Sequence, residues 1–490
     1  MFLKRCLDFI KMRFLSKVIS NSFNGVKGIH TTSAVSMRST AGGPPPIERS
    51  YPVSGKSPKV VTASEAIDVI KSGDNVFVHG IACTPTPLLE ALCSAAKSKN
   101  LKNVKLHHLH LEGPTPWLAE DVRDKIRSNS LFTGHNLRKA VNEGWVDFNS
   151  TFLHEVPLLF RKGAIKLDVA LLQVSPPDEH GFCTLGTSID TARAAIQHAG
   201  IIIAMSNKNM PRTFGDGVIH QSHIDYLVEA HDFPIHLRAM PTIGEVEQKI
   251  GQIIANELVD DGATLQMGIG AIPDAALASM KNHKDLGIHT EMFSDGVLDL
   301  VESNAITNKY KYTQPGRMSV SFVYGSQKLY KFLDNNPFVH FGDVAVINDP
   351  SVIRKNPKVT AINSCVEIDL TGQIVSDSVG TKLISGFGGQ VDFIRAAALS
   401  NDGLGRPIIA LPSITKKGQS KIVPTLQDGG GVVTTRAHAH YIVTEYGVAE
   451  IWGKNMRQRA YELIRIAHPS AREGLEKAAF ERFKVMPSRD

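Results

Sequence analysis

The sequence has no long hydrophobic run, no closely spaced cysteine pair and no excess of charge over most of its length. Its apolar stretches fall short of the 18 or more residues that a membrane-spanning helix needs, so we expect no membrane insertion. Its five cysteines are scattered, odd in number and without a CxxC pair, which argues against a disulfide framework and a structural zinc site. At 490 residues the chain is too long for one ordinary core and predicts two or three domains.

The excess of positive over negative charge is confined to the first 38 residues. This segment holds seven basic residues and one acidic residue, so it accounts for the whole formal net charge of +6. Removing it from the totals of 54 basic and 48 acidic residues leaves 47 of each. A neutral body offers no general attraction for nucleic acid, and we expect no nucleic-acid partner.

The basic head has the pattern of a mitochondrial presequence. Phenylalanines and aliphatic residues alternate with Lys and Arg, and the hydroxyl-rich stretch "HTTSAVSMRST" follows. We predict a transit peptide at residues 1–38, a location in the mitochondrial matrix, and a linker at 39–56 around "AGGPPPIERSYP". The alternative is a disordered basic tail, although phenylalanines are uncommon in such tails.

Two segments of the chain, residues 70–93 and 259–280, resemble each other. Each follows a helix-like stretch and is typical of a strand, a glycine-containing loop and a helix with a proline near its start. The matching positions are Gly73 with Gly262, Gly80 with Gly268, Pro85 with Pro273, and Leu89 with Leu277. A duplication explains this match, and the alternative is a supersecondary unit that two α/β domains share.

Short apolar runs alternate with helical patterns beyond both copies. They occur at 167–175, 199–206, 339–348 and 406–413. Strands buried on both faces and separated by helices predict parallel sheets. We therefore predict an α/β fold with mainly parallel sheets in two similar halves, residues 57–235 and 236–490, and an active site at the interface of the halves.

The stretch "LQMGIGAIPDAAL" begins as a dinucleotide-binding fold does. Glu291 lies 23 residues after Gly268, where such folds place an acid on the ribose. Pro273 stands in place of the third glycine, which speaks against a nicotinamide-dependent dehydrogenase but leaves it as an alternative. The loop still predicts backbone N–H groups directed at an anion or oxyanion. Its residues are Gly268, Ile269, Gly270, Ala271 and Ile272.

A second glycine cluster, Gly386, Gly388 and Gly389, lies between a short strand and a helix in "ISGFGGQVDFIRAAAL". Three glycines in four positions favour close approach of the backbone to a ligand, and the alternative is a tight turn. Lys416 in "SITKKGQSKIVP" is a candidate phosphate contact, although such lysine runs are usually solvated surface.

The carboxylate of Glu291 follows an apolar stretch in "GIHTEMFSDG". Here it can hold a ribose, act as a nucleophile or form a structural ion pair. Asp295 fits a turn.

We expect the histidines of "HHLHLEG" (107–113) to be core or solvated residues, because no carboxylate or cysteine completes a ligand set, so we predict no metal.

Several motifs, in order, resemble the acetyl-CoA hydrolase/CoA-transferase family. They are "VSPPDEHGFCTLGTSIDTARAAI", "NMPRTFGDGVIH", "GIGAIPDAAL", "GIHTEMFSDGVLDLVESNAITN", "ISGFGGQVDFIRAA" and "TEYGVAEIWGKNMRQRA". The similarity covers about residues 59–483 and is greatest to the branch of 4-hydroxybutyrate and butyryl-CoA:acetate CoA-transferases.

The resemblance implies that Glu291 is the nucleophile of a ping-pong reaction with a glutamyl-CoA thioester intermediate. It also implies that the Gly268–Ile272 loop lines the CoA site and that the second glycine cluster adds backbone contacts. The implied function is transfer of CoA between short-chain acyl-CoA and a carboxylic acid, with acetate as an expected partner. Coenzyme A would be a substrate, no other cofactor would be needed, and the protein would be a homodimer or other homo-oligomer.

Two further alternatives stay open at this point. An acetyl-CoA hydrolase would release acetate and CoA by letting water intercept the covalent enzyme. A non-catalytic acyl-CoA-binding protein would have less reason to keep Glu291 within an intact motif.

Overall fold

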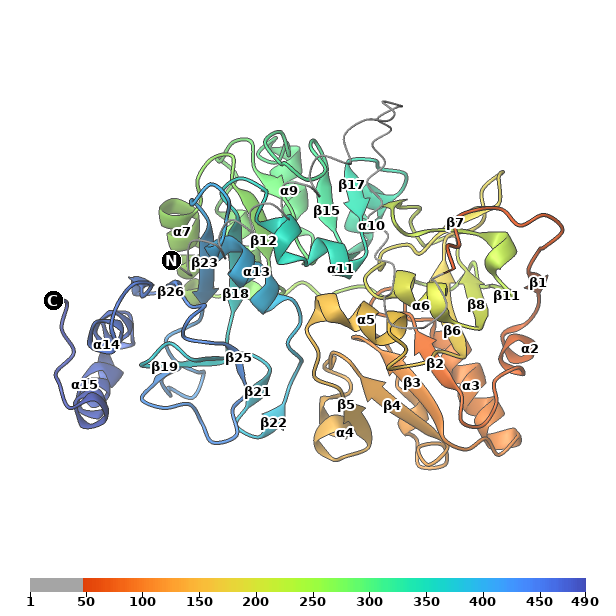
Figure 1. Ribbon diagram of the computed structural model, residues 1–490, viewed down its shortest axis with the longest axis horizontal. Coiled ribbons are helices and arrows are strands. Elements are labelled where there is room, and N and C mark those ends of the chain that lie inside the picture. The colour runs from red at the N-terminus through yellow and green to blue at the C-terminus, as the bar shows by residue number, and fades with distance from the viewer. Residues whose placement is uncertain (1–46) are drawn as a thin grey trace, which may run out of the picture. The chain divides into compact units, whose positions relative to one another are not determined.

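The computed structural model describes residues 47–490 (Figure 1). The predicted presequence and the beginning of the predicted linker lie outside the described residues. The remainder of the linker, residues 47–56, contains no helix or strand. Within the described chain, no helix combines the length and the apolar character that crossing a membrane requires.

The first large sheet has eight strands, all parallel, from residues 59–229. In order across the sheet they are β1 (Lys59–Val60), β11 (Tyr226–Glu229), β8 (Ile201–Ser206), β6 (Val169–Val174), β2 (Asn75–Val78), β3 (Val104–His108), β4 (Ile126–Ser130) and β5 (Val146–Phe148). The helices of this segment are α2 (Ala63–Ile67), α3 (Thr86–Ser98), α4 (Arg138–Asn142), α5 (Val156–Arg161) and α6 (Ala192–His198). Every residue of β6 is buried, because neighbouring strands and helices cover it on all sides.

The second large sheet has six strands, five parallel and the last antiparallel. They are β13 (Gly287–Ile288), β12 (Thr264–Met267), β18 (Thr360–Ser364), β23 (Arg406–Ala410), β26 (Tyr441–Thr444) and β27 (Gly447–Glu450). The helices of this segment are α7 (Glu245–Leu258), α8 (Ala271–Ala278), α9 (Gly296–Glu302), α10 (Gln327–Leu333), α11 (Val344–Ile347), α12 (Pro350–Ile353), α13 (Gln390–Ala398), α14 (Met456–Arg465) and α15 (Pro469–Phe483).

Smaller sheets surround these two. A three-stranded sheet has the order β15 (Met318–Val320), β17 (Val339–Phe341) and β9 (Phe214–Gly215), so it joins segments far apart in sequence. The other short strands are β7 (Phe182–Thr184) with β10 (Val218–His220), β14 (Met292–Phe293) with β16 (Phe322–Val323), β21 (Ser378–Val379) with β22 (Lys382–Leu383), and a four-stranded sheet of β24 (Ile422–Val423), β19 (Glu367–Asp369), β20 (Ile374–Val375) and β25 (Val432–Thr434).

The predicted α/β fold with mainly parallel sheets is confirmed, and three of the four apolar runs are strands as expected (β6, β8 and β23). The prediction for 339–348 is wrong in its second half. Strand β17 ends at Phe341, and residues 344–347 form helix α11. The carboxylate of Asp343 accepts a hydrogen bond from the Ala345 N–H and so caps a helix where apolar content alone favoured a strand.

Both repeated segments have the predicted helix–strand–loop–helix order. Helix α2 precedes the first segment, which holds β2 and the start of α3, and helix α7 precedes the second segment, which holds β12 and α8. Strands β2 and β12 each lie inside a sheet, between β6 and β3 and between β13 and β18, respectively. Their carboxyl ends therefore open onto edges of the sheets where ligands of α/β proteins commonly bind.

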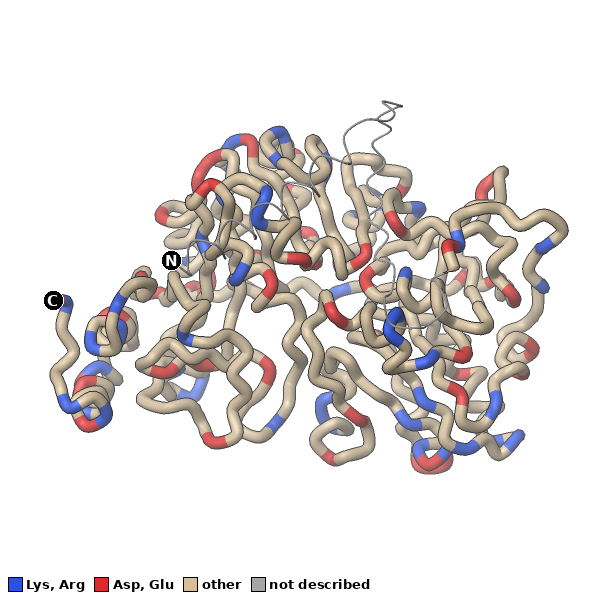
Figure 2. The backbone as a smooth tube through the Cα atoms, viewed as in Figure 1, with Lys and Arg blue, Asp and Glu red and all other residues tan. Residues whose placement is uncertain are grey.

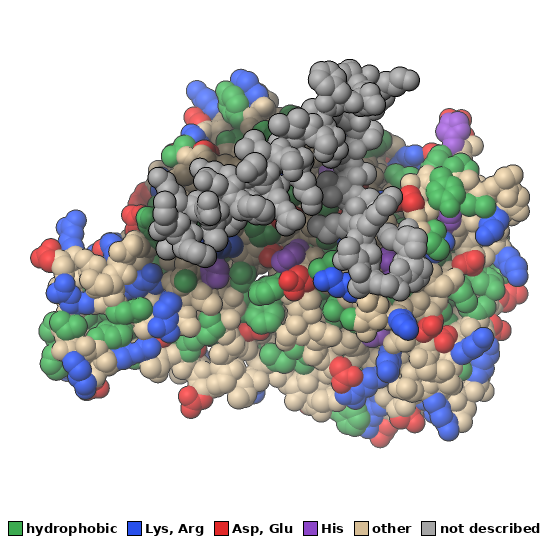
Figure 3. Space-filling view, viewed as in Figure 1, with side chains coloured by type: hydrophobic (Ala, Val, Ile, Leu, Met, Phe, Trp, Pro, Cys, Tyr) green, Lys and Arg blue, Asp and Glu red, His purple; other side chains and the backbone are tan. Residues whose placement is uncertain are grey.

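Charge is distributed as the sequence predicts. Lys and Arg are interspersed with Asp and Glu along the backbone of the described residues (Figure 2). On the face shown in Figure 3, hydrophobic, basic and acidic side chains are likewise mixed.

Candidate active site

Glu291 lies at the carboxyl edge of the six-stranded sheet. It is the third residue after β13 and directly precedes β14. Its backbone oxygen accepts hydrogen bonds from the N–H groups of Ser321 (2.9 Å) and Phe322 (3.1 Å), which fixes the backbone there. The side chain is half-buried, so the carboxylate is removed from bulk water but not sealed off.

Two donors hold the Glu291 carboxylate. Nδ2 of Asn348, the residue after α11, donates to Oε2 at 2.7 Å. The backbone N–H of Gly389, the residue before α13, donates to the same carboxylate. The side chain therefore has a defined position before any substrate binds.

Burial raises the pKa of Glu291 to about 7. The Asn348 and Gly389 hydrogen bonds lower this pKa, whereas the nearby carboxylates of Asp392 and Asp190 raise it. Near neutral pH the group is thus a partly desolvated carboxylate that is in part protonated. The ionised fraction is less hydrated than a free carboxylate and is therefore the more nucleophilic.

The second glycine cluster lies against this carboxylate, as the sequence suggested for a ligand-contacting loop. A Cβ atom on Gly389 would lie well under 3.0 Å from both Oε2 of Glu291 and Nδ2 of Asn348. A Cβ atom on Gly388 would lie 4.0 Å from Oε1 of Glu291. Glycine at position 389 is therefore a steric requirement of the site.

The same glycines also contact the loop that follows β4. Cβ atoms on Gly386 and Gly388 would lie 3.1 and 3.2 Å from the ring of Phe132. The Leu153 N–H donates to the Gly388 carbonyl at 3.0 Å. The glycine cluster is thus held between Glu291 and residues of the first large sheet's segment.

The Gly268–Ile272 loop lies beside Glu291 at the carboxyl end of the neighbouring strand. The Met267 N–H donates to Oγ1 of Thr290, the residue before Glu291, at 3.3 Å. Gly270 has φ +140° and open space where a Cβ would point, and Ile269 is 45% exposed. Helix α8 starts here without a side-chain cap, so its first N–H groups are available to a ligand.

Two further residues, His154 and Asp392, extend the site, and sequence reasoning missed them as well as Asn348. Nδ1 of His154 lies 2.8 Å from Oδ1 of Asp392, whose side chain is 4% exposed. Burial raises the pKa of Asp392, and the contacts with His154 and Asn348 lower it. The Asp392 contact raises the pKa of His154. Asn348 therefore lies between two carboxylates, those of Glu291 and Asp392.

These missed residues left weak signals in the sequence. Asp392 stands in the quoted motif "GFGGQVDFIRAA", but a helical acid among apolar residues has many uses. Asn348 closes the run at 339–348, which was interpreted as a strand. The Asp295 prediction is confirmed, because this residue forms the turn before α9 and its carboxylate accepts from the Ser326 N–H at 3.0 Å.

Lys416 lies apart from these groups, in a cavity of about 610 Å³. The lining includes Lys416, Lys421 and Glu445, together with the start of α7, and does not include Glu291 or Gly268. The cavity lies beyond the carboxyl ends of β23 and β26, so it shares the sheet edge with Glu291.

The histidines of residues 107–113 divide into two kinds. Nε2 of His107 hydrogen bonds with Asn75, Nε2 of His108 hydrogen bonds with Ser128, and burial lowers the pKa of each histidine to about 4. These two are core residues, as predicted. The expectation that no carboxylate completes a ligand set is wrong for His110, because Glu112 and His135 lie beside it.

Most of the chain is similar to known proteins. The acetyl-CoA hydrolase/transferase N-terminal domain matches residues 53–237, and the C-terminal domain of that family matches residues 325–479. A succinyl-CoA:acetate/propanoyl-CoA:succinate CoA transferase of Fasciola hepatica is 57% identical over 444 residues, covering 90% of this chain and 92% of that protein.

Bacterial proteins are similar too. The 4-hydroxybutyrate coenzyme A transferase of Clostridium kluyveri is 47% identical, covering 87% of this chain and 98% of that protein. The crystal structure of 4-hydroxybutyrate CoA-transferase from Porphyromonas gingivalis superposes with a TM-score of 0.75 at 39% identity, covering 87% of this chain and 98% of that chain. The chain therefore belongs to the acetyl-CoA hydrolase/transferase family.

Proposed function

We propose that this protein is a CoA-transferase that exchanges coenzyme A between short-chain acyl-CoA and carboxylic acids, with Glu291 as nucleophile. The observation that carries the proposal is the half-buried Glu291 carboxylate, held by Asn348 and Gly389 beside a glycine loop. Family membership supports it, and the similarity to the Fasciola protein makes acetate, propionate and succinate the first acids to consider.

The first step forms an anhydride. An oxygen of the Glu291 carboxylate attacks the thioester carbon of acyl-CoA, the C–S bond breaks, and CoA leaves as a thiolate. That thiolate then attacks the side-chain carbonyl carbon of Glu291 and displaces the substrate's carboxylate. The enzyme now holds a glutamyl-CoA thioester, and the first acid departs.

The second half of the reaction reverses these steps with another acid. Its carboxylate attacks the glutamyl carbon and expels CoA thiolate, which attacks the new acyl carbon of the anhydride. The new acyl-CoA leaves and the Glu291 carboxylate is regenerated. The thioester free energy is conserved, because each acyl derivative is as reactive as the next.

Each addition generates an oxyanion that needs hydrogen-bond donors. The Asn348 amide, the Gly389 N–H and the first N–H groups of α8 are the candidates next to Glu291. We propose that the site lies where these groups face the Phe132 loop of the other half. We also propose that the cavity at Lys416 and Lys421 receives the phosphates of CoA, with the pantetheine arm crossing the sheet edge toward Glu291.

The two enzymatic alternatives fit less well. Glu291 follows the strand beside the glycine loop, as the ribose-binding acid of a dehydrogenase would. Its carboxylate is instead engaged by Asn348 and Gly389, which leaves it less suited to a ribose. A hydrolase would have no use for a glutamyl-CoA intermediate, since water could attack the anhydride directly.

A panel of acids tests the function. The purified protein is incubated with acetyl-CoA alone, and then with succinate, propionate, butyrate or 4-hydroxybutyrate, while free CoA and each acyl-CoA are measured separately. We expect new acyl-CoA only when an acid is present, with little free CoA. Release of free CoA at a rate that no acid changes would identify a hydrolase instead.

The pH dependence of kcat/KM should follow the ionisation of Glu291. Since the ionised form is the nucleophile and burial raises its pKa to about 7, kcat/KM should approach its maximum well above pH 7 and fall about tenfold per pH unit well below it. Asn348→Ala removes a donor that lowers this pKa, so the inflection should move to higher pH and kcat should fall by about 10²-fold or more.

Asn401→Ala is the matched control, because Asn401 is exposed and its recorded hydrogen bond is made by the backbone N–H. It should leave both the rate and the pH profile unchanged. A wild-type profile that stays flat down to pH 5.5, or an Asn348→Ala profile identical to wild type, would contradict the assigned role of the carboxylate.

We further propose that the protein acts in the mitochondrial matrix and forms a homodimer or other homo-oligomer. Residues 1–38 fused to a fluorescent reporter should direct it to mitochondria, and a cytosolic reporter would contradict the proposed transit peptide. Light scattering on the purified protein measures the oligomeric state directly, and a monomer would contradict the second proposal.

A further inference from the structure

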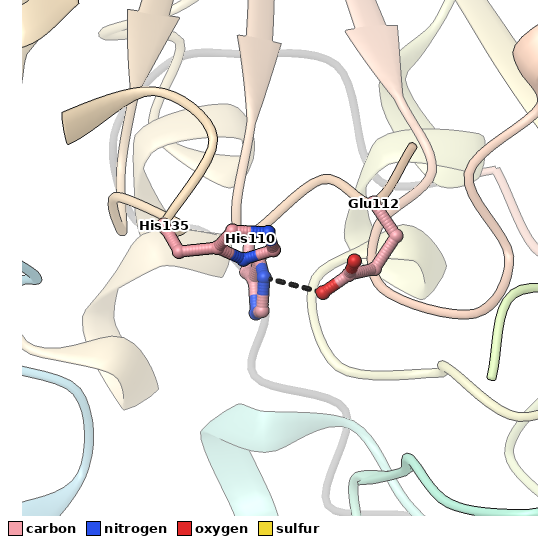
Figure 4. A group of neighbouring side chains, drawn as sticks. All are labelled: His110, Glu112 and His135. Atoms are coloured by element: carbon pink, nitrogen blue, oxygen red, sulfur yellow. Dashed lines mark ion pairs between the residues drawn. The ribbon is translucent and has the colours of Figure 1, made fainter. Parts of the chain in front are cut away.

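Three potential metal ligands, His110, Glu112 and His135, face one another at the carboxyl edge of the eight-stranded sheet. His110 and Glu112 follow β3, and His135 follows the neighbouring β4. Figure 4 shows the two imidazole rings together and the Glu112 carboxylate directed toward His110. One nitrogen of each histidine and one carboxylate oxygen all lie within 4.8 Å of one another.

The backbone holds these side chains in place. Leu111 is fully buried and continues the strand pairing, so His110 and Glu112 project to the other side of the extended segment. Nδ2 of Asn136 donates to the carbonyl oxygens of Leu111 and Gly113, both at 3.1 Å. The loop carrying the second histidine is therefore tied to the segment carrying the other two ligands.

The close approach of the two loops also depends on Gly134. A Cβ atom there would lie under 3.0 Å from the ring of His110. The absence of a side chain at Gly134 lets the imidazole of His110 lie directly against the loop that ends in His135.

The electrostatics suit a cation. Nε2 of His110 lies 2.7 Å from Oε1 of Glu112, yet this buried nitrogen has no aligned hydrogen-bond partner among the described residues. A cation bound between them, with the two atoms slightly farther apart, would give this buried nitrogen the partner that it lacks.

We propose that His110, Glu112 and His135 bind one divalent transition-metal ion of the Zn²⁺ class. Two imidazoles and one carboxylate form a ligand set of this kind, with bonds of about 2.0–2.2 Å that place tetrahedral ligands about 3.3 Å apart. His135 is exposed and gives the ion a path from solvent.

The proposed metal site replaces the expectation from sequence that no metal is bound, and it does not depend on the proposed CoA-transferase activity. Sequence spacing could not reveal it, because His135 lies 25 residues after His110 and reaches it only through the pairing of β3 with β4.

Cobalt binding tests the proposal. The protein is stripped with a chelator, and Co²⁺ is added while visible absorption and bound metal are measured. We expect one Co²⁺ to bind per chain and Zn²⁺ to displace it. The bound Co²⁺ should show the intense visible absorption of a tetrahedral site. His135→Ala should weaken binding by more than about 100-fold, since even loss of a group that merely orients a ligand costs 10- to 100-fold.

His135→Ala removes an exposed side chain, so it tests the site with little risk to folding. Glu112→Gln, which keeps the side chain's size, provides a second variant. His180→Ala, at a histidine whose side chain is 73% exposed, is the matched control and should bind Co²⁺ as wild type does. The proposal would be overturned if the wild type failed to bind Co²⁺. It would also be overturned if His135→Ala and Glu112→Gln bound Co²⁺ as tightly as the wild type does.

Discussion

Glu291→Gln is expected to lower kcat by at least about 10⁴-fold, because an amide oxygen cannot form the anhydride on which the proposed reaction depends. The fold should survive the change. Glutamine keeps the size of the side chain and can still accept from Asn348, and it removes a charge that burial disfavours. We therefore expect a Tm no lower than that of the wild type, together with retained acyl-CoA binding.

Glu302→Gln serves as the matched control. Glu302 lies at the end of the helix after the site, and its side chain is 61% exposed in an ion pair with Lys328. Surface ion pairs of this kind contribute about 0–1 kcal/mol, so turnover and Tm should stay near the wild-type values. Turnover within tenfold of wild type in Glu291→Gln would remove Glu291 from the role of nucleophile.

Gly389→Ala is expected to lower kcat by about 10²-fold. The backbone at Gly389 has φ −103°, which alanine adopts without strain, so the effect is one of space. The added methyl group would overlap both the Glu291 carboxylate and the Asn348 amide, and one of them must move. A displacement of about 1 Å from the reactive position can cost a factor of this size. Kinetics under saturating acyl-CoA measures the loss.

Gly474→Ala provides the comparison for this variant. Gly474 lies within α15, and a Cβ atom there has open space around it, so alanine should slightly stabilise the helix and leave kcat unchanged. Overpacking at Gly389 can also cost about 1–3 kcal/mol of stability, so the kinetics must be measured well below the Tm of each variant. A kcat of Gly389→Ala equal to that of Gly474→Ala would contradict the described site.

Much of the fold could be predicted from local sequence. Strands β6 and β8 are continuous apolar runs because both faces of a central parallel strand are covered. The glycine-containing turns and the helices after β2 and β12 also follow from local patterns. The run at 339–348 was misjudged because one aspartate, Asp343, ends the strand and caps a helix.

The candidate site was only partly predictable. Glu291 and the two glycine loops stand in recognisable motifs. The structure places the second loop against the Glu291 carboxylate and joins Met267, which precedes the first loop, to Thr290. The roles of Asn348 and His154 depend on tertiary packing. Asn348 contacts Glu291 across 57 residues of sequence, and His154 contacts Asp392 from the other half of the chain. Lys416 lies apart from Glu291 because other strands of the sheet stand between them. The order of strands in a sheet cannot be predicted from local sequence.

The covalent intermediate tests the central claim most directly. The protein is mixed with acyl-CoA in the absence of any acceptor acid, denatured in acid to preserve a thioester, and digested for mass spectrometry. We predict a CoA adduct on the peptide that contains Glu291, formed together with one equivalent of released acid per active site and absent in Glu291→Gln. Release of acid without a CoA adduct, or an adduct on another residue, would contradict the account.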